Sequence, residues 1–164
     1  MKRITLVILS IALTGCAQPV SHATQSGKPE ACIRNAKPPL VSADLASLLL
    51  DHGYSISQQT DTMVRGDRPV DNVAAAVLLG SRYDSTPNAR ITYSIVKRAD
   101  CVRVVADIMI VTNPGSAYER LTPMNNSADS LKIQDTLDAI RQKYDPTPPA
   151  AEIDNNAQAE ALKH

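Results

Sequence analysis

The fold is decided by residues 90–112, which read RITYSIVKRADCVRVVADIMIVT. Apolar residues stand at every second position from 91 to 95 and again from 102 to 110, with a short polar connection at 98–100. A period of two is typical of strands that bury one face. The stretch therefore predicts a long antiparallel β-hairpin.

The opposite face of the second strand of this hairpin is mixed in character. It carries Arg103, Val105, Asp107, Met109 and Val111, so charged and apolar side chains share one surface. Antiparallel sheets commonly leave one face to solvent. This face is therefore expected to be exposed to solvent or to contact a partner.

Helical patterns lie on both sides of the hairpin in the sequence. Ser42 is a suitable N-cap for a helix whose leucines recur at helical spacing up to Gly53. Residues 54–64 alternate weakly and predict one or two strands, residues 72–79 form an alanine-rich helical pattern, and residues 127–144 an amphipathic helix. We expect an α+β fold, in which an antiparallel sheet with a long hairpin carries about three helices on one face as a two-layer sandwich.

The first residues have the pattern of an export signal. Lys2 and Arg3 precede an apolar run of about ten residues, too short for a membrane-spanning helix, which needs about 20. The run leads into Leu13-Thr14-Gly15-Cys16, which resembles the lipobox of bacterial lipoproteins. The resemblance implies cleavage before Cys16, a diacylglyceryl thioether on its sulfur and an acyl chain on its freed amine. The alternative is an ordinary secretory signal beside an incidental cysteine.

The same resemblance implies a location and a domain organisation. Lipoproteins kept in the inner membrane usually have aspartate after the cysteine; Ala17 stands there, so we expect the outer membrane, facing the periplasm. The inner membrane and the cell surface stay open as alternatives. The rest of the chain is similar to the small α+β modules of proteobacterial envelope lipoproteins. We expect a signal peptide at 1–15, a lipidated N-terminus and flexible tether at 16–39, a globular domain at 40–145 and a disordered tail at 146–164.

The cysteine count fits an oxidising compartment. With Cys16 acylated, Cys32 and Cys101 remain as an even pair, which in the periplasm predicts one disulfide. A redox-active pair is the weaker alternative because the two residues do not have the C-x-x-C spacing.

Charge and composition limit the possible ligands. The chain has 17 basic and 17 acidic residues, and loss of Lys2 and Arg3 with the leader would leave 15 basic residues and a formal charge of −2. A near-neutral protein lacks the basic surface of a nucleic-acid binder. The three histidines stand far apart, at positions 22, 52 and 164, so we expect neither a metal site nor a cofactor.

Two clusters are candidate sites. Asp51-His52 with Ser55 or Ser57 supplies the residue types of a nucleophilic triad, but a histidine at a helix end can instead contact the last carbonyls. We adopt the second interpretation and predict no catalytic residue.

The other cluster follows Asn113-Pro114-Gly115, which suits a type II turn. Tyr118, Glu119 and Arg120 are the candidate partner-binding residues, because ordered polar loops often carry recognition. The alternative is a simple crossover with Tyr118 packed inward.

These observations predict a non-enzymatic function. We expect a lipid-anchored module, held to the membrane through Cys16, that binds or scaffolds another envelope component, most simply a protein. The alternatives are a cell-envelope hydrolase with an unrecognised site and a carrier of a small apolar ligand between helices and sheet.

Overall fold

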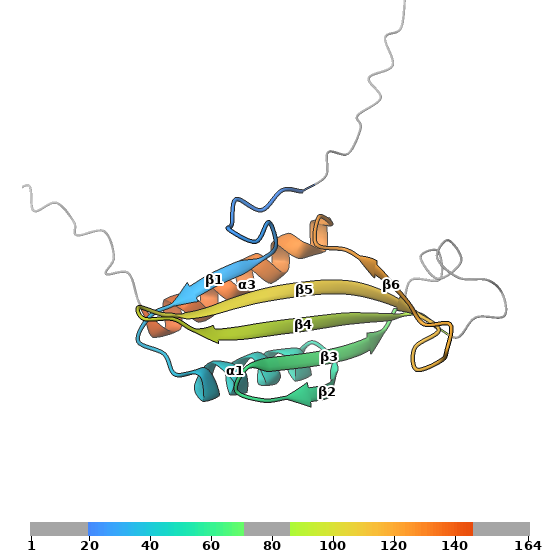
Figure 1. Ribbon diagram of the computed structural model, residues 1–164, viewed down its shortest axis with the longest axis horizontal. Helices are drawn as coiled ribbons and strands as arrows, with labels where there is room; N and C mark the ends of the chain where they lie inside the picture. Colours follow the sequence, from blue (N-terminus) through green and yellow to red (C-terminus); the bar gives the residue numbers. More distant parts are fainter. Residues whose placement is uncertain (1–19, 71–85, 146–164) are drawn as a thin grey trace, which may run out of the picture.

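The computed structural model describes residues 20–70 and 86–145. Its elements in chain order are β1 (Glu30–Ile33), α1 (Pro38–Asp51), β2 (Ser55–Gln59), β3 (Met63–Pro69), β4 (Asn88–Lys97), β5 (Val102–Thr112), β6 (Arg120–Pro123) and α3 (Ala128–Tyr144). The strands form one antiparallel sheet in the order β1-β5-β4-β3-β2, and β6 pairs with the part of β5 that β1 leaves free. Both helices lie on the same side of this sheet (Figure 1).

The predicted fold class and hairpin are confirmed. The chain is α+β with an antiparallel sheet, and β4 pairs with β5 over the whole length of β4, from Asn88↔Val111 to Lys97↔Val102. The described residues contain two helices; the third one expected, at residues 72–79, lies outside them.

The folded part begins earlier than the sequence predicted. Residues 30–33, assigned to a flexible tether, form β1 and pair with the start of β5, with Ala31 and Ile33 buried. Ahead of β1, the amide of Val20 already donates to the carbonyl of Asn126 at 3.2 Å. The predicted domain boundary at residue 40 is therefore wrong. A strand of four residues is too short to show alternation, and its partner lies about 70 positions further along the chain.

Helix α1 also begins before the predicted N-cap. Its first two residues are Pro38 and Pro39, whose fixed φ suits the first helical turn and whose missing amide hydrogens need no partner there. Ser42 lies inside the helix, is 3% exposed, and donates its hydroxyl to the carbonyl of Thr60 at 2.8 Å. The predicted end is confirmed, because Gly53 has a φ of +75° directly after the helix.

The core lies between the helices and the inward face of the sheet. Helix α1 packs on β2, β3 and β4, whereas α3 packs on β1 and β5. Gly66 in β3 allows the close contact with α1, since an added Cβ would stand 3.1 Å from both Leu49 Cδ1 and Tyr54 Cβ. The most deeply buried apolar side chains are Ile33, Val41, Leu45, Leu49, Val64, Tyr93, Val102, Val104, Ala106, Val111 and Leu137.

Candidate interaction surface

The outward side of the sheet is not covered by either described helix. We call it the open face; its side chains come from alternate positions of four strands. They include Glu30 on β1, Met63, Arg65 and Asp67 on β3, Arg90, Thr92 and Ser94 on β4, and Arg103, Val105, Asp107 and Met109 on β5. The mixed surface predicted for the second hairpin strand is therefore part of a larger one. Val111 departs from the prediction, because it is fully buried.

One end of the open face is organised around Arg90. Its Nε donates to Asp67 Oδ1 at 2.6 Å, and its Nη1 donates to Glu119 Oε1 at 3.2 Å. Glu119 also accepts a hydrogen bond of 2.8 Å from the amide of Gly115, and this bond, followed by that from Arg90, lowers the pKa of Glu119. The loop after β5 is thus fastened to the open face through a carboxylate that stays ionised.

A second ion pair on the open face joins β1 to β5. Arg103 donates from Nε and Nη2 to the two carboxylate oxygens of Glu30 at 2.6 and 2.8 Å. These hydrogen bonds lower the pKa of Glu30 to about 2. A forked pair of this kind fixes both side chains, because two parallel bonds set the orientation as well as the distance.

Asp107 connects the open face to the segment before β1. Its carboxylate lies 3.0 Å from the ammonium of Lys28 and accepts a hydrogen bond of 2.8 Å from the side-chain amide of Asn125. The same Asn125 accepts a 2.8 Å bond from the amide of Ile108 through its Oδ1. Asn125 therefore links β5 to the start of α3.

The three candidate binding residues have different surroundings. Glu119 belongs to the ion-pair network around Arg90, whereas Tyr118 is 80% exposed and Arg120, the first residue of β6, is also exposed. The alternative in which Tyr118 packs inward is therefore wrong. The predicted turn fits, because Gly115 has a φ of +76° and the amide of Ser116 donates to the carbonyl of Asn113 at 3.2 Å.

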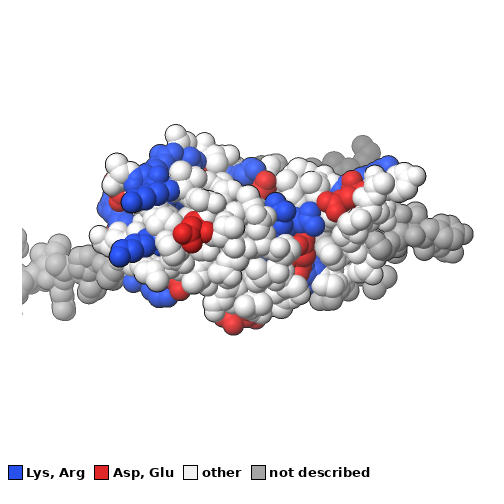
Figure 2. Space-filling view, turned by 60° about the horizontal axis from the view of Figure 1, so that its bottom comes forward, with Lys and Arg blue, Asp and Glu red and all other residues white. Residues whose placement is uncertain are grey.

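The charges are not spread evenly over the surface. In Figure 2 acidic and basic atoms lie side by side over the middle of the visible face, and basic atoms gather toward the end where β4 turns into β5, on the left in this view and in Figure 1. Exposed cations there include Lys97 and Arg98 at the turn and Arg34 and Lys37 after β1. We call these four residues the basic end.

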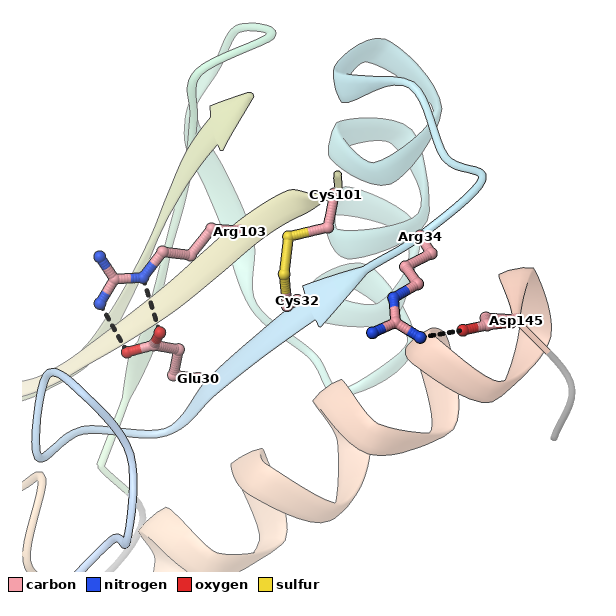
Figure 3. The surroundings of a disulfide bond; sticks show 6 residues. All are labelled: Glu30, Cys32, Arg34, Cys101, Arg103 and Asp145. Atoms are coloured by element: carbon pink, nitrogen blue, oxygen red, sulfur yellow. Dashed lines mark hydrogen bonds and ion pairs between the residues drawn. A yellow bond between two sulfur atoms is a disulfide. The ribbon is translucent and has the colours of Figure 1, made fainter. Parts of the chain in front are cut away.

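The disulfide lies at this basic end. Cys32 and Cys101, the pair that the cysteine count predicted, are bonded to each other with their Cα atoms 5.6 Å apart, and they join β1 to the start of β5 (Figure 3). Beside them Arg34 lies 3.9 Å from Asp145, at the end of α3. The end of β1 and the end of α3 thus meet here.

The contacts of the described residues bear on two kinds of chemical site, a metal site and a nucleophilic triad. Among residues 20–70 and 86–145, the potential metal ligands that come together are Cys32, Asp100 and Cys101, and the two sulfurs are already bonded to each other. His52 donates from Nδ1 to the carbonyl of Leu48 at 2.9 Å, which is the helix-end contact that the sequence allowed. Cys16, the predicted lipid site, lies outside the described residues.

Sequence reasoning missed the ion pairs and the burial of His22. Arg103 and Asp107 were placed on the correct face, but their partners follow from strand register, which no single segment contains. His22, read as part of the tether, is 8% exposed in the fold. Its neighbours in sequence are polar or small, so no local signal marks it as buried.

Comparison with known proteins adds no family. No model of a known protein family matches the chain, and no curated protein sequence is significantly similar to it. Of the helices described, neither is both long and apolar enough to cross a membrane.

Proposed function

We propose that this chain is a non-enzymatic, lipid-anchored module of the outer membrane that binds another envelope component from the periplasmic side. The attachment would be through acyl chains on Cys16, as its resemblance to a lipobox implies. Three chains would hold the protein stably, since one chain alone gives only marginal membrane binding.

The open face is the observation that carries the binding role. Its charged side chains are fixed by the Arg90 and Arg103 ion pairs, so they do not need to lose much rotational freedom when a partner binds. Tyr118, 80% exposed, stands on the loop that Glu119 ties to this face. Exposed tyrosines and ordered arginines are common in the energetically dominant parts of protein interfaces.

Lipidation is tested on the mature protein itself. Intact mass spectrometry of material extracted from the envelope should give a chain that begins at Cys16 and carries the added mass of a diacylglyceryl group and an acyl chain. A Cys16→Ser variant should lack both the added mass and the membrane association. An unmodified thiol on the mature wild-type protein would contradict the anchor.

Binding is tested with a matched pair of variants. Ser94 lies exposed on the open face and Ser47 lies exposed on α1, on the other side of the molecule. After capture from detergent-solubilised envelope, Ser94→Arg should weaken retention of a reproducible partner by about tenfold or more, equivalent to about 1.4 kcal/mol, whereas Ser47→Arg should not. Equal retention by both variants would contradict binding through the open face, and the absence of any partner would contradict a binding role.

A further inference from the structure

We propose that the lipid-anchored domain places one defined end against the lipid surface. This end, which we call the anchor end, comprises Val20, His22, Asn125, Asn126 and Leu131. The inference rests on the lipidation of Cys16 proposed above. It adds which part of the domain faces the membrane.

The length of chain between the lipid and the fold supports this orientation. Only residues 17–19 separate Cys16 from Val20, whose amide is bonded to the carbonyl of Asn126. Four Cα-to-Cα steps span at most about 14 Å. The anchor end therefore cannot move further than that from the acylated residue while these contacts hold.

The side chain of His22 holds residues 20–22 on the domain through two contacts, which we call the histidine clasp. Ser130 donates its hydroxyl hydrogen to the carbonyl of Ser127 at 2.6 Å, so its oxygen is left as an acceptor. His22 Nε2 lies 2.8 Å from that oxygen and 3.1 Å from the carbonyl of Asn125. Because both partners accept, Nε2 must carry hydrogen and donate to them. The clasp thus fastens residue 22 to the start of α3.

One partner of the histidine clasp, Asn125, is also bonded to the sheet. The side chain of Asn125 bonds to Asp107 and to the amide of Ile108, both on β5. Residue 22 is therefore connected, through Asn125, to the middle of β5.

The chemistry of the anchor end suits contact with lipid headgroups. Leu131, the residue after Ser130, is 46% exposed, and the neighbouring charges of Asp129 and Lys132 form an ion pair of 2.8 Å. This part of α3 therefore presents apolar surface and balanced charge to the membrane. By contrast, charge alone would bring the basic end to an anionic membrane, at about 1 kcal/mol for each lysine or arginine near the surface.

The two ends are far enough apart to be distinguished. Asp145, which follows α3, lies beside Arg34 at the basic end, and the 17 residues of α3 span about 25 Å between the two ends. Val96, 52% exposed on β4, pairs with Arg103 and stands next to Lys97 of the basic end. Leu131, near the start of α3, and Val96, beside the β4–β5 turn, are thus similarly exposed apolar positions that lie far apart on the domain.

The experiment uses the absence of tryptophan from the sequence, because a single introduced tryptophan is then a unique fluorescent donor. Mature Leu131→Trp and Val96→Trp proteins, purified with their lipid, would be reconstituted into phosphatidylethanolamine–phosphatidylglycerol vesicles that contain dansyl-labelled phosphatidylethanolamine. Energy transfer to the dansyl group should be severalfold larger from position 131 than from position 96. Circular dichroism of both variants checks that each is folded.

A second variant tests the role of the short connection. About 12 Gly and Ser residues inserted between Pro19 and Val20 leave the described fold untouched and allow an average separation of about 20 Å. The difference in transfer between positions 131 and 96 should then decrease strongly. A difference that does not change would contradict the argument from chain length.

The outcomes separate this inference from the proposed anchor. Equal transfer from both positions in a protein shown by mass to be lipidated would overturn the orientation and leave the anchor intact. A mature protein without lipid on Cys16 would overturn both. Larger transfer from position 96 would show that the basic end, and not the anchor end, faces the lipid.

Discussion

Removal of the disulfide should cost a large share of the stability of the domain. Cys32 is exposed and Cys101 is buried, so the change that disturbs packing least is Cys32→Ser with Cys101→Ala. The two cysteines are 69 positions apart. A cross-link over this distance lowers the conformational entropy of the unfolded chain, and its removal should lower the free energy of unfolding by about 4 kcal/mol. A domain of this size has a total stability of about 5–15 kcal/mol.

Urea denaturation measures this effect. With a slope of about 2 kcal/mol per molar, the midpoint of the double variant should lie about 2 M below that of the oxidised wild-type protein. The reduced wild-type protein serves as the control and should unfold near the variant, because the cross-link is the only difference that matters. A loss below about 1 kcal/mol would refute the reasoning that the bond stabilises by restricting the unfolded chain.

Three further substitutions test other features of the fold. Tyr93→Phe should leave stability unchanged or raise it by about 1 kcal/mol in thermal or urea unfolding, since the fully buried hydroxyl has no hydrogen-bond partner among the described residues; a clear loss would show that the hydroxyl is bonded. Gly66→Ala should destabilise by about 1–3 kcal/mol, because the new methyl group would stand 3.1 Å from Leu49 and Tyr54; a stabilised variant would contradict the close packing of α1. Glu30→Gln should cost about 2 kcal/mol near neutral pH, after allowance for solvent screening of a partly exposed pair. Because the folded pKa of Glu30 is lowered from 4.5 to about 2, that stability is present above pH 4.5 and lost as the pH falls toward 2, so a wild-type-to-variant difference that is constant over this range would contradict the ion pair.

The parts of the fold that sequence could predict are those with long, regular patterns. The strands β4 and β5 of the hairpin alternate over residues 91–95 and 102–110, and α3 begins after the predicted Ser127 and ends at Tyr144. By contrast, β1 and β6 have four residues each and owe their conformation to pairing with β5. Such short strands carry too few positions to show a period of their own.

The candidate surface was predictable only in outline. Alternation placed Arg103 and Asp107 on the outward face, but their ion pairs with Glu30 and Lys28 need a strand that the sequence did not reveal. The start of α1 was missed for a different reason: Pro38 and Pro39 were read as the end of a tether, although proline is also favoured in the first turn of a helix.

The position of the disulfide determines how the domain would respond to a mechanical load. A pull on the N-terminal end of the chain would first break the His22 contacts and then separate the part of β1 ahead of Cys32 from β5. Once the stretch ahead of Cys32 is extended, the force passes through the covalent bond to Cys101 and bypasses the 69-position loop between them. A load carried along the chain would therefore act on the residues ahead of Cys32 and after Cys101, while α1 and strands β2 to β4 stay shielded from tension.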